Sequence, residues 1–130
     1  MDKSHILRTF NNHFEEFLED VLRVFPDNKD IITCKQALLT MRKMNPKILL
    51  MAYTNTVANP YREKIVQNDL TFFINKNYQE DIYFEADTTK HVLEKIDLLR
   101  KPIGEMCVED KKIVAKYLNN LLKLSDLYNS

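Results

Sequence analysis

The chain has 130 residues, of which 45% are hydrophobic and 29% charged, and its nineteen basic and nineteen acidic side chains give a formal net charge of zero. This composition is typical of one globular domain, here 1–130, and does not favour a disordered chain. The zero charge counts against a dedicated nucleic-acid binder, which needs basic side chains for its phosphate contacts.

The first helix is predicted from about Ser4 to Val24, with Ser4 as its N-cap. Phe25-Pro26 ends it, because the residue before a proline avoids the α region. A second helix follows and stops at Met44-Asn45-Pro46. Apolar residues recur at three- and four-residue spacing in both segments: Leu7, Phe10, Phe14, Phe17, Leu18, Val21 and Phe25, then Ile31, Cys34, Leu38 and Met41.

Two Asn-Pro pairs predict the next helix starts. Asn45 is expected to cap a third helix, with Pro46 in its first turn, and this helix ends near Ala58. Asn59-Pro60 then opens a short fourth helix through about Val66. One or two further helical turns carry the apolar residues Leu70, Phe72, Phe73 and Ile74.

The last third of the chain predicts two more helices. Asn75-Lys76-Asn77 predicts a loop, and Tyr78 to Ala86 are compatible with helix or irregular structure. Asp87-Thr88-Thr89 can cap the helix that follows. Lys101-Pro102-Ile103-Gly104 is expected to break that helix. The final helix begins near Glu109 and Asp110, where negative charge is favourable. The expected apolar faces are Val92, Leu93, Ile96 and Leu99, then Ile113, Val114, Tyr117, Leu118, Leu121, Leu122 and Leu124.

Gly104 is the only glycine of the chain. Glycine provides the positive φ angles of tight turns and lets backbone approach phosphates closely. The sequence therefore excludes a Gly-rich phosphate loop and disfavours tight two-residue hairpins. Together with the helical periodicity, this predicts an all-α compact bundle of five to seven helices, in which the first and last helices contribute most of the core.

The titratable residues do not predict catalysis. His13-x-x-Glu16 and His91-x-x-Glu94 have the reverse order of the Glu-x-x-His pairs in di-metal bundles, so we expect solvated outer faces and no metal site. Cys34 lies on an apolar stripe and is interpreted as core packing. We predict no enzyme activity, no catalytic residue and no cofactor.

A basic segment offers one candidate binding surface. Residues 35–64 contain five candidate phosphate contacts against the single acid Glu63: Arg42, Lys43, Lys47, Arg62 and Lys64. The alternative is that these residues face the acidic first helix or another protein chain.

Aromatic residues offer a second candidate surface, for a protein partner or self-association. Adjacent aromatics between Leu70 and Phe84 cannot all point into one core, and interfaces favour such residues. The alternative is a lid buried across the bundle. The candidate interface residues are Phe72, Phe73, Tyr78, Tyr83 and Phe84.

The chain resembles small uncharacterised proteins encoded by large nucleocytoplasmic (giant) DNA viruses. Three segments carry the resemblance: the run from Phe10 to Asp20, the pairs Phe25-Pro26 and Asn45-Pro46 with their neighbours, and the closing run from Glu109 to Leu124. The resemblance implies a small helical protein that is abundant or associated with the virion, and it brings no catalytic residues.

No apolar run approaches the ~20 residues that a membrane span needs, and Met1–His5 lead into a charged amphipathic segment unlike a signal peptide. We therefore expect an intracellular location, in the host cytoplasm or viral factory, or a place in the virion. The predicted function is a non-enzymatic protein-interaction or virion-structural subunit. The alternative is a nucleic-acid-associated factor that uses the basic segment.

Overall fold

Helices form every regular element in the part of the chain that the computed structural model describes, residues 2–75 and 87–130, with side chains described from 94 onward in the second range. This confirms the all-α prediction. The elements are α1 (Lys3–Val24), α2 (Lys29–Met44), α3 (Ile48–Tyr53), the π-helical segment η1 (Thr54–Ala58), α4 (Asn59–Val66), α5 (Thr71–Asn75), α6 (Asp87–Gly104) and α7 (Val108–Asn129).

Polar side chains set the starts of the first two helices. Asp2, and not the predicted Ser4, is the N-cap of α1: its backbone is extended and its carboxylate accepts a hydrogen bond from the Ser4 amide at 3.3 Å. Ser4 already lies in the first helical turn, so it cannot cap it. Asn28 caps α2, because its Oδ1 accepts from the amides of Asp30 and Ile31 at 2.9 and 3.1 Å.

The segment from α3 to α4 passes through the π-helical segment η1 and is kinked at Tyr61, whose backbone angles (φ −125°, ψ 24°) are not helical. The predicted fourth helix is confirmed, since α4 spans Asn59–Val66 with Pro60 in its first turn; it follows η1 without a loop, because Ala58 and Asn59 both have helical backbone angles. The Asn59 amide donates to the Thr54 carbonyl, five residues back, and the kink at Tyr61 comes directly after Pro60. Asn45 stabilises the turn before α3, accepting from the Lys47 amide at 3.2 Å, and does not cap α3 itself.

The helix α6 ends at Gly104, within the predicted break at residues 101–104, but Pro102 lies inside the helix and does not interrupt it. Burial explains the extension: Ile103 is fully buried, so the two residues after Lys101 are held against the core. The lone glycine serves close approach here. A Cβ on Gly104 would lie 3.1 Å from the Ile74 side chain of α5. Gly104 is not needed for a positive φ angle; in the described residues the one positive φ is at Asn68.

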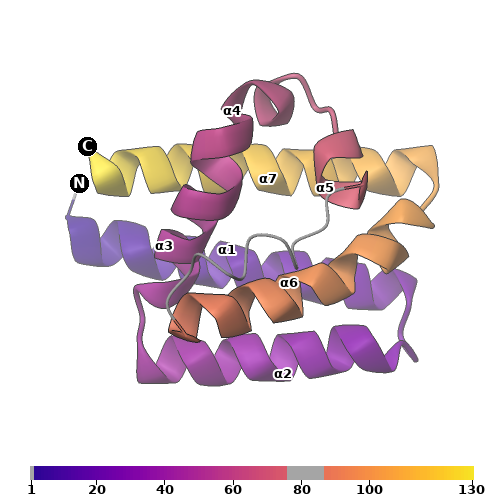
Figure 1. Ribbon diagram of the computed structural model, residues 1–130, viewed down its shortest axis with the longest axis horizontal. Coiled ribbons are helices and arrows are strands. Elements are labelled where there is room, and N and C mark those ends of the chain that lie inside the picture. Colours follow the sequence, from indigo (N-terminus) through magenta and orange to yellow (C-terminus); the bar gives the residue numbers. More distant parts are fainter. Residues whose placement is uncertain (1, 76–86) are drawn as a thin grey trace.

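The helices form two layers. Helices α2, α1 and α7 lie side by side in one layer, and α6 with the α3–α4 path crosses them in the other, with both chain termini at one end (Figure 1). The core fills the space between the layers. Tyr53 of α3 is 2% exposed, and its hydroxyl donates to the Leu118 carbonyl of α7 at 2.7 Å. The prediction that α1 and α7 contribute most of the core is wrong, because they supply eleven of the 28 buried hydrophobic residues in the described part of the chain: Ile6, Phe10, Phe14, Phe17, Leu18 and Val21, then Val114, Ala115, Leu118, Leu121 and Leu122.

Among the described helices, none is long and apolar enough to cross a membrane.

Candidate functional site

Three of the five candidate phosphate contacts pair with acidic residues of their own chain. The Arg42 guanidinium donates to the Glu15 carboxylate on α1. On α4, Arg62 pairs with Asp126 of α7, and the Lys64 ammonium lies 3.7 Å from the Asp69 carboxylate. The Arg42–Glu15 contact fits the alternative in which the basic segment faces the acidic first helix, whereas Arg62 and Lys64 pair with acidic residues outside α1.

The structure does not bring the five basic residues into one patch. Arg42, Lys43 and Lys47 lie at the end of α2 and in the turn after it. Arg62 and Lys64 belong to α4, which lies over α7, at the other edge of the molecule from α2 (Figure 1). Lys43 and Lys47 are exposed, and no ion pair involves either of them within the described residues.

The described part of the aromatic segment is largely buried. Phe73 is 3% exposed and packs in the core. The half-buried Phe72 ring stacks on Tyr61 at a centroid distance of 4.8 Å. Phe73 therefore offers no exposed ring to a partner, and both residues contact the bundle as the lid alternative expects. The remaining candidate interface residues, Tyr78, Tyr83 and Phe84, lie outside the described residues.

A polar cluster that the sequence did not single out joins α1 to α7. The Tyr117 hydroxyl donates to the Asp20 carboxylate, which also lies 2.7 Å from the Arg23 guanidinium. The Tyr117 ring packs 4.8 Å from His13 and 5.4 Å from Phe17, centroid to centroid. Burial, and then the hydrogen bond to Asp20, raise the pKa of Tyr117, so its hydroxyl stays protonated and remains a donor.

Beside this cluster lies a hollow of about 110 Å³ between α1 and α7, which we call the α1–α7 depression. Val24 and Ile113 are 37% and 48% exposed at its edge. Ile113 was expected within the apolar face of the last helix, and it lies instead at the margin of that face. The depression is lined by Phe17, Asp20, Val21, Arg23, Val24, Met106, Asp110, Ile113, Val114 and Tyr117.

The depression was missed because its parts come from two helices at opposite ends of the sequence. One signal was available in the sequence. Val24 and Ile113 are apolar residues at the edges of the apolar faces of the first and last helices, where a helix that buries a single face usually has polar residues. Spacing within one helix cannot show that the two edges meet.

The two cysteines are free thiols in different surroundings. Cys34 is fully buried, and burial raises the pKa of its thiol to about 12, so it stays protonated at neutral pH. Cys107 is exposed at the start of α7. His13 lies 3.6 Å from Glu16, and no group of three or more metal-ligating side chains gathers within the part of the chain that the structure describes. The side chain of His91 lies outside that part.

No protein-family model matches the chain, and neither a curated protein nor a solved structure matches it. The arguments on function therefore start from the geometry of the described residues.

Proposed function

We propose that this chain is a non-enzymatic protein-interaction subunit that binds partner chains through the α1–α7 depression, as a virion-structural protein of a large DNA virus would. The observation that carries the proposal is the pair of exposed apolar residues, Val24 and Ile113, at the edge of a hollow with an aromatic floor.

The chemistry of the depression is that of a protein interface. Its floor holds Phe17 and Tyr117, and interface centres are enriched in aromatic residues that form well-packed pockets. Its rim is polar, with Arg23 on α1 and Asp110 on α7. A hollow of about 110 Å³ is below the ~300 Å³ at which small-molecule pockets begin, so an inserted apolar side chain is the better occupant.

The occupant that we propose is a second copy of this chain. In a two-fold symmetric dimer the same patch of each copy faces the other. A charged residue on one side of the symmetry axis therefore faces the residue that lies on the other side of the axis in the partner copy. Because α1 and α7 are neighbours, a two-fold contact here can set Arg23 of one copy against Asp110 of the other. The zero net charge also removes long-range repulsion between copies.

Sedimentation velocity from low micromolar to submillimolar concentration tests this proposal. We expect the wild type to form a dimer and Ile113→Asp to remain monomeric, because a carboxylate would have to be buried in the contact. Val66→Asp is the matched control, since Val66 is also exposed, at 61%, but lies on α4. A wild type that is monomeric at every concentration, or an Ile113→Asp variant that associates like the control, would refute the proposal.

A nucleic-acid-associated factor is the second candidate; the observation in its favour is that Lys43 and Lys47 are exposed and form no ion pair with any residue that the structure describes. Each true phosphate contact steepens the salt dependence of duplex-DNA binding by about 0.9 in log–log slope. We expect the double variant Lys43→Glu with Lys47→Glu to lose the slope contribution of about two phosphate contacts. Lys123→Glu on α7 should leave the slope unchanged. No binding at low salt removes this candidate.

A further inference from the structure

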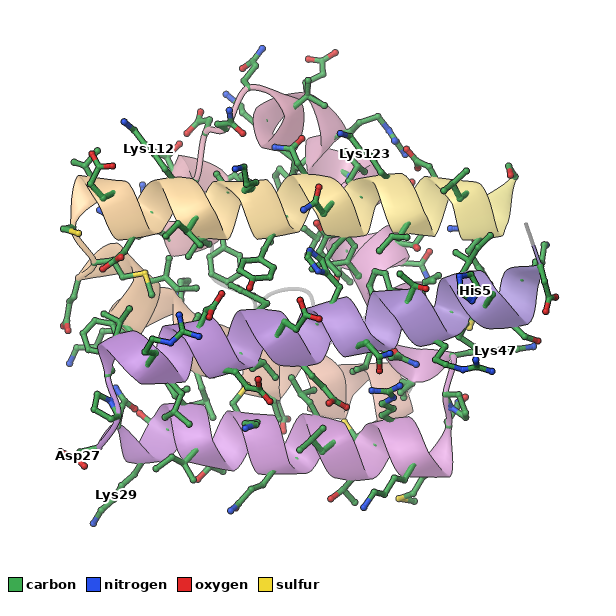
Figure 2. The ribbon with its side chains drawn as sticks, turned by 180° about the vertical axis from the view of Figure 1, so that it is seen from behind. His5, Asp27, Lys29, Lys47, Lys112 and Lys123 are labelled. Atoms are coloured by element: carbon green, nitrogen blue, oxygen red, sulfur yellow. The ribbon has the colours of Figure 1, made fainter. Side chains whose placement is uncertain are left out.

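A groove of about 340 Å³ lies between the start of α7 and α5 with the turn before it, and we call it the α5–α7 groove. It is separate from the α1–α7 depression, because no residue lines both and the labelled Lys112 points away from α1 (Figure 2). The groove is lined by Asn68, Asp69, Leu70, Thr71, Ile74, Val108, Lys111, Lys112 and Ala115.

The floor of the groove is apolar. Leu70 and Ala115 are buried, and Ile74 is half-buried beside them. At the start of α7, Val108 is 67% exposed, more than the other exposed apolar residues of this helix, Ile113 and Leu127. Apolar surface that continues from a buried floor to an exposed edge marks a contact site.

The α7 side of the groove has the length of two helical turns. Val108, Lys111 and Ala115 share one face of α7, because they are three and four residues apart. At 1.5 Å per residue, this face is about 10 Å long. It therefore has room for two apolar side chains that are four residues, or about 6 Å, apart on a partner helix.

Lys111 gives the groove its net charge. Its side chain is half-buried and forms no ion pair with any residue that the structure describes. The other charges of the lining are paired: the Asp69 carboxylate lies 3.7 Å from the Lys64 ammonium, and the Lys112 ammonium lies 3.8 Å from the Glu109 carboxylate. One uncompensated positive charge beside an apolar floor is complementary to a carboxylate that flanks apolar side chains.

We propose that the α5–α7 groove binds an amphipathic helix of a partner protein, with two apolar side chains in the groove and an acidic side chain next to them. The apolar pair covers Leu70, Ile74 and Val108, and the carboxylate meets Lys111. This contact does not depend on the dimer at the α1–α7 depression, and it gives the chain a second binding surface on another face of α7.

Other occupants fit the α5–α7 groove less well. A nucleic-acid strand would find no aromatic side chain in the lining on which a base could stack, and Lys111 alone neutralises one phosphate. A second copy that met the groove across a two-fold axis would bring like charges together, because the same positively charged lining would face itself.

Fluorescence anisotropy on the full chain, with a labelled and stapled helical peptide, tests the proposed chemistry. The peptide has two leucines four residues apart with glutamates beside them, and its control has lysines in place of the glutamates. We expect the acidic peptide to bind at least ~10-fold more tightly than the basic one. Equal affinity for the two peptides, or no binding of the acidic peptide at millimolar concentration, would overturn the proposal.

A charge reversal on the protein tests the role of Lys111. In Lys111→Glu we expect the preference to reverse, so that the basic peptide binds more tightly. Lys123→Glu makes the same charge change further along α7 (Figure 2) and should keep the preference for the acidic peptide. If both variants change the preference equally, attraction to net charge alone explains the binding and the proposal fails.

Methyl NMR and sedimentation velocity locate the contact. The acidic peptide should shift the methyl signals of Ile74 and Val108 and leave those of Val24 and Ile113 unchanged; the opposite pattern would place the peptide in the α1–α7 depression and refute the proposal. Val108→Asp changes an exposed residue and should weaken peptide binding by ~10-fold or more, without changing the sedimentation of the free chain. If Val108→Asp instead abolishes self-association, a second copy occupies the groove and the proposal is wrong.

Discussion

The hydroxyl of Tyr53 offers a clean measurement of how strongly the two layers are joined. Tyr53 is 2% exposed, its ring packs edge-on against Phe10 at 5.7 Å, and its hydroxyl donates to the Leu118 carbonyl at 2.7 Å. Tyr53→Phe removes only the hydroxyl and keeps the ring in the core. A typical intramolecular hydrogen bond contributes about 1 kcal/mol to the free energy of unfolding. For a domain of this size, that loss lowers Tm by about 3–5 °C.

Urea unfolding followed by circular dichroism, with a parallel thermal scan, measures this loss. Tyr128→Phe is the matched control, because Tyr128 is half-buried and no hydrogen bond of its hydroxyl occurs within the described residues. We expect the control to change stability by less than about 0.5 kcal/mol. If Tyr53→Phe is as stable as the control, the bond between α3 and α7 does not contribute as the structure indicates.

Four further predictions concern individual contacts and the two cysteines. Asn28→Ala should reduce the free energy of unfolding by about 1 kcal/mol, measured in urea, because it removes the cap of α2, whereas an unchanged midpoint would show the cap to be dispensable. A double-mutant cycle of Arg42→Met with Glu15→Gln should give a coupling energy of about 0.5–1 kcal/mol that shrinks in about 1 M salt; zero coupling at low salt would contradict the pairing. A thiol-reactive dye should label Cys107 alone in the native protein and both cysteines in denaturant. Burial raises the pKa of Cys34 from 9.0 to about 12. The stability that the neutral thiol contributes is therefore complete below pH 9 and is lost as the pH rises toward 12. Cys34→Ala should flatten this part of the stability–pH profile.

The fold was predictable from the sequence where a local signal decides the outcome. Apolar spacing identified the long helices α1, α2 and α7, and Phe25-Pro26 marked the first boundary. The errors occurred where tertiary packing overrides a local signal. A proline at position 102 predicts the end of a helix, but the buried Ile103 holds the last turn of α6 against the core, and the helix extends to Gly104. The Asn59-Pro60 pair correctly marked the start of α4, but it could not show that the π-helical segment η1 leads into that start without a loop.

The candidate surfaces were less predictable, because they depend on which helices become neighbours. Charge counting found Arg42, but only the structure shows that Glu15 lies across from it. Neither Asn11 nor Tyr117 carries a motif. Each is important because of a contact with a residue at least 35 positions away in the sequence: Asn11 contacts Pro46, and Tyr117 contacts Asp20.

The central claim, that copies of this chain meet at the α1–α7 depression, is tested most directly by methyl NMR over a dilution series. We predict that the methyl signals of Val24 and Ile113 shift or broaden with rising concentration. The methyl signals of Val66 and Leu127, which are similarly exposed but do not line the depression, should stay constant. Concentration-independent signals from Val24 and Ile113, or changes confined to Val66 and Leu127, would contradict the claim.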